Sequence, residues 1–301
     1  MKSGRIVRNY LLLPISMGAL CCQSWAAAPT QLTAAQIVAK NVAARGGAQA
    51  WRAVQSIEFS GTMQAGGHKE PSRSAFVKRS AALDGSALAE QVELPFVMEL
   101  KRPRKQRLEL QFAGSNALQV YDGTKGWKLR PYLNRLEVEP YTAEELKAAA
   151  SESELDGPLV DYQAKGTRVE LEGHEKVEGR DTYRLKLTMK NGSIRHLWID
   201  ATSFLETKIE GTPRKLDGAN RPVEIYYREY HQVHGLSVPY LLETRVQAVK
   251  PVAGSTQISE KIMIHDVVVN PKLEDALFMK PDLHASPATA SVAKPHETKA
   301  N

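Results

Sequence analysis

Two histidines are the most suggestive candidates for metal chemistry in this sequence. His231 and His234 are three residues apart. A pair of imidazoles is typical of a zinc site when both rings project from one surface. Here the pair flanks Gly235, between two runs rich in β-branched and aromatic residues, and no cluster of acids lies beside it. The spacing therefore favours turn or surface histidines, with a metal-binding pair as the minor alternative. The same interpretation, packed or surface positions, applies to His196 and His265.

Acidic residues gather in one mid-chain segment, at Glu144, Glu145, Glu152 and Glu154. A solvated helix face is the usual meaning of such a run, and general acid–base catalysis is the alternative. The sequence has no glycine-rich phosphate loop, no nucleophile elbow and no His-Glu-x-x-His motif. We therefore expect a protein that is not an enzyme and that has no catalytic residue, no metal site and no cofactor.

The first residues are typical of a secretory signal. Lys2, Arg5 and Arg8 precede a short apolar run, 10–20, and Ser24-Trp25-Ala26 offers small residues for cleavage. We predict a signal peptide over 1–26 that is cleaved near Ala26, and export to the periplasm. The apolar run is too short to span a bilayer.

The two cysteines of the chain, Cys21 and Cys22, lie within this segment. They are lipid-attachment sites or they leave with the signal. The residues before them, Gly18-Ala19-Leu20, do not have the order of a lipobox, which favours removal. The mature chain then has no disulfide and no thiolate.

Composition and charge place the rest of the chain among soluble globular proteins. Of 301 residues, 42% are hydrophobic and 25% are charged. The formal charge of +6 falls to about +3 without the signal, which is too weak to indicate nucleic-acid binding. From Ala285 onward small and polar residues predominate, and we expect a disordered tail over 283–301.

The apolar spacing predicts many strands and few helices. Thr33 can cap a helix that ends at Gly46-Gly47, and Thr142 can cap a second over 142–150, with a short helix or turn over 155–162. Elsewhere apolar residues alternate with polar ones in roughly ten runs, including 74–78 and the two around His234-Gly235. So many strands predict a curved sheet, and helices inserted mid-chain suggest a cover for its open face.

The run 101–105 is strongly basic. A solvated turn is the simpler interpretation, and a binding site for an acidic partner or for anionic head groups is the alternative.

As a whole the sequence resembles the LolA/LolB-like superfamily of periplasmic outer-membrane lipoprotein-sorting proteins. Short motifs carry the resemblance, in order along about 33–282: Gly46-Gly47 with Trp51, Lys101-Arg102-Pro103-Arg104 with Arg107-Leu108, Tyr121-Asp122-Gly123 with Gly126-Trp127, Gly179-Arg180-Asp181-Thr182-Tyr183, Trp198-Ile199-Asp200, Gly235-Leu236-Ser237-Val238-Pro239, and Asn270-Pro271 with Asp275-Ala276-Leu277-Phe278 and Pro281. The resemblance implies a mainly β (α+β) fold, a curved, incomplete antiparallel barrel with a helical plug or lid, over an apolar cavity. It also implies a lipid- or lipoprotein-binding domain over 27–282.

Strand alternation and the expected lid select ten residues to line that cavity, and plain core packing is the alternative for each: Phe96, Leu110, Phe112, Trp127, Leu155, Leu159, Tyr183, Leu185, Leu187 and Trp198. The expected function is a monomeric periplasmic carrier for lipid or acylated protein cargo, with a membrane protein as a further partner. The alternatives are an envelope sensor or adaptor with the same fold, which the basic turn motivates, and an envelope hydrolase.

Overall fold

The computed structural model describes residues 32–65, 92–112, 114–216, 218–246 and 258–283. The predicted signal at 1–26, with Cys21 and Cys22, and the strand expected at 74–78 lie outside these ranges. So does the expected tail, apart from Leu283. No helix in the described ranges has the length and apolar character needed to cross a membrane.

Three α-helices and many strands make up the described chain. The helices and short 3-10 turns are α1 (Ala34–Ala44), α2 (Ala48–Ala53), η2 (Pro131–Leu133), α3 (Ala143–Glu152) and η3 (Asp275–Phe278). The strands of the first half are β1 (Ser56–Ala65), β2 (Val92–Lys101), β3 (Lys105–Phe112), β4 (Ser115–Tyr121), β5 (Gly126–Arg130), β6 (Arg135–Pro140) and β7 (Arg168–Val177). Those of the second half are β8 (Arg180–Thr188), β9 (Ile194–Asp200), β10 (Glu206–Glu210), β11 (Arg214–Leu216), β12 (Ala219–Arg221), β13 (Val223–Val233), β14 (Leu236–Val246) and β15 (Ile258–Val269).

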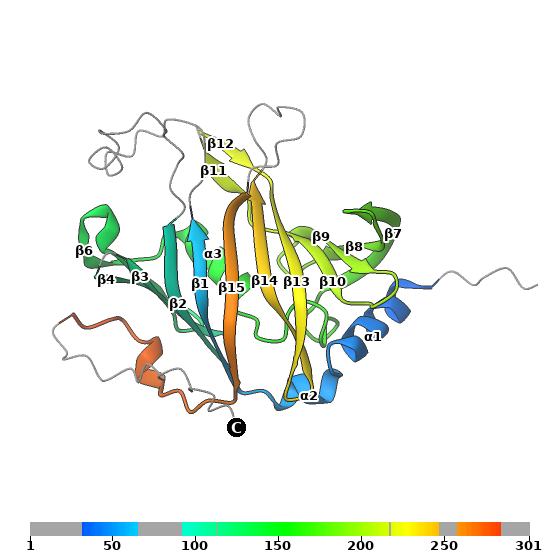
Figure 1. The fold of residues 1–301 in the computed structure, drawn as a ribbon, viewed down its shortest axis with the longest axis horizontal. Coiled ribbons are helices and arrows are strands. Elements are labelled where there is room, and N and C mark those ends of the chain that lie inside the picture. Colours follow the sequence, from blue (N-terminus) through cyan, green and yellow to red (C-terminus); the bar gives the residue numbers. More distant parts are fainter. Residues whose placement is uncertain (1–31, 66–91, 113, 217, 247–257, 284–301) are drawn as a thin grey trace, which may run out of the picture. The chain divides into compact units, whose positions relative to one another are not determined.

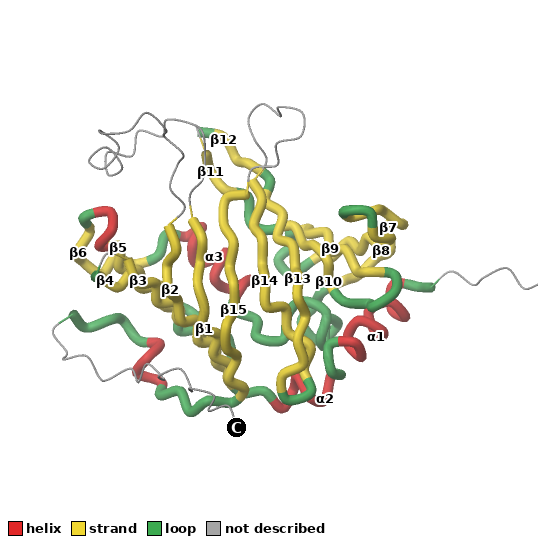
Figure 2. The backbone as a smooth tube through the Cα atoms, in the orientation of Figure 1, coloured by secondary structure: helices red, strands yellow, loops and turns green. Residues whose placement is uncertain are grey.

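Thirteen of these strands form one antiparallel sheet in the order β6-β5-β4-β3-β2-β1-β15-β14-β13-β10-β9-β8-β7. The sheet does not close, because β6 and β7 remain at opposite edges. In Figure 1 the central strands β2, β1, β15, β14 and β13 run side by side, with α3 behind them. Figure 2 shows α1 and α2 at one end of the strands, near the β13–β14 turn. The predicted open, curved antiparallel sheet is confirmed.

The local signals in the sequence form the helices as expected. Thr33 accepts a hydrogen bond from the Gln36 amide, and the Gln36 side chain accepts one from the Thr33 amide, which completes a capping box at the start of α1. Thr142 and Glu145 make the same pair of bonds at the start of α3. The segment 155–166 after α3 consists of turns.

The hairpin at His234-Gly235 also forms as expected. Both residues have positive φ, 48° and 80°, which is the conformation of a two-residue type I′ turn. Strands β13 and β14 are therefore held in one register along their length. This register fixes which side chains of the two strands face α3.

Candidate functional site

The curvature of the sheet follows from what α3 touches. Near its start, Glu145 pairs with the ammonium of Lys128 on β5. At its end, the Ser151 hydroxyl accepts a 2.8 Å hydrogen bond from Arg195 on β9. Eight strands lie between β5 and β9, which a flat sheet would hold about 40 Å apart. A helix of 10 residues is only about 15 Å long, so the sheet curls around α3.

The register shows which side chains line the concave face under α3. The Lys128 side chain points toward α3, so its side of the sheet is the concave one. Successive cross-strand pairs place Phe59 and Met63 of β1 on the same side of the sheet as Lys128. Met63 continues a row across five adjacent strands, here called the concave row: Leu94, Met63, Ile262, Leu242 and Tyr227. Each of the five is half-buried. An apolar row covered by a packed helix would be fully buried, so the row retains accessible surface.

The helix above the row is not packed like a core helix. None of the ten residues of α3 is fully buried, although the helix crosses the apolar face of the sheet. Its polar contacts with the sheet lie at its two ends. Besides the Lys128 and Arg195 contacts, Glu152 accepts a hydrogen bond from the Thr212 hydroxyl.

The start of α3 is set by a close approach between Gly126 on β5 and the ring of Tyr141, just before the helix. A Cβ at Gly126 would lie 2.0 Å from the ring of Tyr141, so β5 needs glycine where the chain crosses onto the concave face. Burial raises the pKa of Tyr141, and the charges of Glu145 and Glu152 add to this rise. The phenol is therefore neutral over the whole physiological range.

Tyr227 lies beneath neighbouring segments at the β13 end of the row. Burial raises the pKa of this phenol, with a further contribution from the charge of Glu206. The residue is half-buried, like the rest of the row. The partly covered concave face under α3 is here called the hollow.

Eight of the ten predicted lining residues lie on strands or turns that face this hollow or the core around it. Phe96 pairs with Leu110, and both share a face with the concave row. Leu110 and Phe112 are half-buried, and Phe96 is buried in the main core with Trp51 and Val160. Tyr183, Leu185 and Leu187 occupy the same face of β8, where Leu185 and Leu187 are fully buried and Tyr183 is half-buried.

The two predicted residues of the turn segment differ from each other. Leu155 is half-buried and packs against the main core, whereas Leu159 has no exposed surface. Together with Val160 they close the α2 end of the concave face.

Trp127 and Trp198 point away from the hollow. Trp127 lies on the opposite face of the sheet, where it pairs across strands with Val120. It packs against Leu273 and Phe278 of the C-terminal segment. Trp198 packs with Val177 and Tyr226, and the Lys208 ammonium lies 3.8 Å from the centroid of its ring. Strand alternation explains why both tryptophans point outward, because the residues that follow them, Lys128 and Ile199, lie on the concave side.

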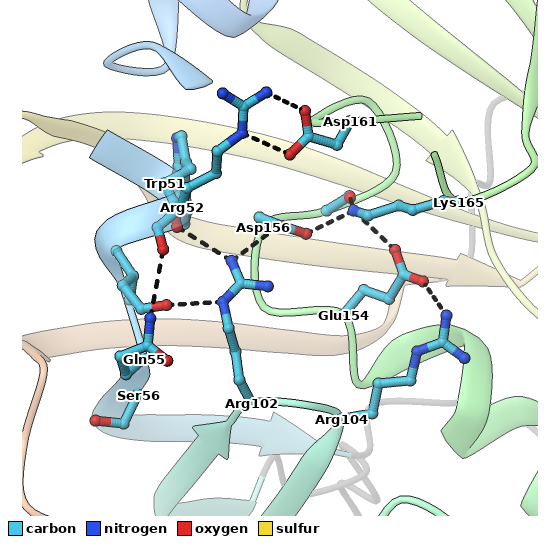
Figure 3. Close-up of polar contacts among 12 residues, drawn as sticks. Trp51, Arg52, Gln55, Ser56, Arg102, Arg104, Glu154, Asp156, Asp161 and Lys165 are labelled. Atoms are coloured by element: carbon cyan, nitrogen blue, oxygen red, sulfur yellow. Dashed lines mark hydrogen bonds and ion pairs between the residues drawn. The ribbon is translucent and has the colours of Figure 1, made fainter. Parts of the chain in front are cut away.

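The basic turn at 101–105 is paired within the chain (Figure 3). Arg102 donates to Asp156 and Arg104 donates to Glu154, both in the segment after α3. Lys101 and Lys105 both pair with Asp275 in η3. The turn therefore holds the chain together, and its four cations already have acidic partners within the chain.

The histidine and acid candidates have structural partners. The ring of His231 stacks on Tyr240 with centroids 4.3 Å apart. His234 lies in the β13–β14 turn and borders a small hollow of about 260 Å³ beside α2. Among the described residues, no group of three or more His, Cys, Asp or Glu side chains could hold a metal ion. A second hollow, of about 500 Å³, is lined by Glu172, Gly173, His174, Glu175 and Arg184, away from α3.

Sequence reasoning missed all five residues of the concave row, one each on β1, β2, β13, β14 and β15. Alternation at Met63 and at Ile262 was available as a signal. No signal in the sequence indicated the pairing of those strands, because long stretches of chain separate them.

Neither the protein-family models nor the curated protein sequences gave a match to this chain. Among solved structures, a LolA superfamily protein from Nitrosomonas europaea is similar at a TM-score of 0.52 and 13% identity, over 83% of this chain and 99% of that one. A putative outer membrane lipoprotein-sorting protein domain from Vibrio parahaemolyticus has a TM-score of 0.48 and 15% identity, over 80% of this chain and 94% of that one. The fold is LolA-like, as the sequence resemblance predicted.

Proposed function

We propose that this chain is a periplasmic carrier that binds lipid, or the acyl chains of lipoproteins, on the concave row beneath α3. Binding needs no catalytic group, so the protein is not an enzyme. Cargo enters and leaves when α3 separates from the sheet at its polar contacts.

One observation carries the proposal: α3 crosses an apolar sheet face without any fully buried residue, above a row of half-buried apolar side chains. Each methylene of an acyl chain that leaves water contributes about 0.8 kcal/mol, so a chain of ten or more methylenes supplies ample binding energy. An apolar row across five strands favours a ligand that is long, apolar and flexible.

The polar contacts at the ends of α3 fit a detachable cover. The contact between Glu152 and Thr212 is exposed, and such a bond contributes about 1 kcal/mol or less, because water replaces it when it breaks. The pair of Glu145 with Lys128 is more buried, at 38% and 8% exposed, and is the stronger restraint. A helix held by apolar packing would be much harder to move.

Native mass spectrometry tests the proposal on the full chain, expressed with its own N-terminal segment and purified from the periplasm without detergent. We expect protein with a co-purifying lipid or acylated peptide, which organic solvent removes. The mass of the protein also tests cleavage near Ala26. Protein that carries no apolar ligand, and that takes up none from added phospholipid vesicles or acylated peptide, would contradict the carrier assignment.

A further inference from the structure

Arg195 is an exception to the pattern of its strand. It pairs across strands with Leu187, and the next concave-side residues of β9 are Leu197 and Ile199. Leu187, Leu197 and Ile199 have no exposed surface. A guanidinium on an otherwise apolar face has a desolvation cost unless it has charged or hydrogen-bonding partners.

The partners that Arg195 does have are neutral. Its Nη2 donates to the Ser151 hydroxyl at 2.8 Å and to the Thr212 hydroxyl at 3.2 Å. Within the described ranges no carboxylate forms an ion pair with it. The nearest acid in this network is Glu152, which accepts from the Thr212 hydroxyl at 3.0 Å. A guanidinium has five N–H donors, so most of its capacity is unused by these contacts.

The other cation beneath α3 provides a contrast. Lys128, at the opposite end of the helix, pairs with both carboxylate oxygens of Glu145. One end of the hollow is therefore neutralised by the protein itself, and the other end is left with a positive charge that only hydroxyls contact.

Arg195 lies beyond the β13 end of the concave row, on the same face. Ile209 pairs with both Leu197 and Ile225. Arg195 and Tyr227 lie two residues from these in opposite directions, so they are offset by about 13 Å along the strands. The charge of Arg195, after that of Arg45, still lowers the pKa of Tyr227, against the larger effect of burial. The head group of an amphiphile whose chain lies on the row would extend past Tyr227 to meet the guanidinium.

We propose that Arg195 binds the oxyanion of an amphiphilic cargo, a carboxylate or a phosphate, while the acyl chain of the same molecule lies on the concave row. The assignment rests on the carrier function proposed above and narrows the cargo to anionic lipids. A planar guanidinium suits either oxyanion because it can donate two parallel hydrogen bonds. The Ser151 hydroxyl, which accepts from Arg195, can also donate its own proton to the bound anion, whereas the Thr212 hydroxyl already donates to Glu152.

The test compares two ligands with the same chain, dodecanoate and dodecanol, by displacement of a fluorescent fatty-acid probe from delipidated protein. Hydrogen bonds to a charged group predict that the wild type binds the acid roughly tenfold to hundredfold more tightly than the alcohol. In Arg195→Gln this ratio should fall to about one, with dodecanol affinity within about twofold of wild type. Dodecyl phosphate should behave like dodecanoate, with tighter binding than dodecanol in the wild type and no such preference in Arg195→Gln.

A matched control removes a different arginine. Arg168 on β7 is 70% exposed and belongs to the outer face, so Arg168→Gln changes the net charge equally and should leave the ratio intact. Arg195→Lys keeps the charge without the planar fork and should retain part of the preference. Thermal unfolding of each variant verifies that it is folded.

The outcomes separate this assignment from the carrier function. Equal binding of acid and alcohol to the wild type, or a preference that survives in Arg195→Gln, overturns the role of Arg195 and leaves the carrier intact. Binding of neither ligand overturns the carrier function. Inorganic phosphate that binds by itself, with a calorimetric heat that Arg195→Gln abolishes, would identify a free-ion site and overturn the amphiphile assignment.

Discussion

The guanidinium of Arg102 donates a 2.8 Å hydrogen bond to the carboxylate of Asp156, which joins the β2–β3 turn to the segment that follows α3 (Figure 3). Arg102 also donates to the carbonyls of Val54 and Trp51 in α2 and its C-terminal cap. Asp156 accepts a second charged bond from Lys165. The segment after α3 is thus tied to α2 and to the β2–β3 turn, whereas α3 itself has no fully buried residue.

Loss of the Asp156 carboxylate should destabilise the fold strongly. Its side chain is only 5% exposed and faces two cations. We expect Asp156→Ala to lower the free energy of unfolding by about 3–5 kcal/mol, because Arg102 and Lys165 are left without their partner. Urea denaturation followed by circular dichroism measures the change.

Asp161 in the same segment provides the control for that measurement. It pairs with Arg52, whose side chain is 60% exposed. Asp161→Asn removes the charge and keeps a residue type that tolerates the positive φ of 51° at this position, so it should cost no more than about 1 kcal/mol. A similar loss in both variants would mean that Asp156 is not an anchor.

Stability should decline in acid. Burial favours the neutral form of Asp156, but hydrogen bonds and charge from Lys165 and Arg102 outweigh it and lower its pKa. A hydrogen bond from Arg228 is the largest cause that lowers the pKa of Glu178, to about 2. Carboxyls with a lowered folded-state pKa stabilise the fold above their unfolded values, near about 4, and this stability is lost as pH falls through the folded values.

Urea midpoints measured from pH 7 to pH 2 provide the measurement. We expect a plateau above about pH 5 and a fall below about pH 4 that Asp156→Asn makes shallower. A wild-type midpoint that is constant down to pH 2 is incompatible with these pKa values.

A polar group in the concave row should weaken cargo binding. Leu242→Gln places an amide where an acyl chain would lie, and the lost apolar contact should raise the Kd for dodecanoate roughly tenfold. Val268→Gln is the matched control, because Val268 lies on the outer face opposite Glu58 and is 38% exposed. Probe displacement compares the two variants, and equal effects would argue against the concave face as the binding site.

Weakening the contact between α3 and β5 should speed cargo release. Glu145→Gln keeps the capping bond to the Thr142 amide but removes the charge that pairs with Lys128, whose side chain is only 8% exposed. Loss of about 1 kcal/mol corresponds to a release rate roughly fivefold higher. Stopped-flow dissociation of the fluorescent probe measures this rate.

Glu144→Gln on the same helical turn controls for the change in charge. Glu144 is exposed and lies outside the Lys128 pair. Its substitution should leave the release rate unchanged. Equal acceleration by both substitutions would indicate that general charge, and not this contact, restrains α3.

The sequence by itself determined the local elements of this protein. Thr33 and Thr142 with their partners Gln36 and Glu145 specify two helix starts, and His234-Gly235 specifies a hairpin turn. These signals act over a few residues, so they can be recognised without knowledge of the rest of the chain. Alternation likewise predicted strands, and their number predicted a sheet that must curve.

Only the tertiary structure decided which faces meet and what they contain. Met63 and Ile262 become neighbours through pairing of strands that are almost 200 residues apart, and no local pattern encodes that register. A shift of one residue sends Trp127 outward and Lys128 toward α3, so the side chains beneath the helix could not be chosen from their hydrophobicity. The unpaired charge of Arg195 also emerges only when the strands curl around α3, because its two partners come from two other segments of the chain.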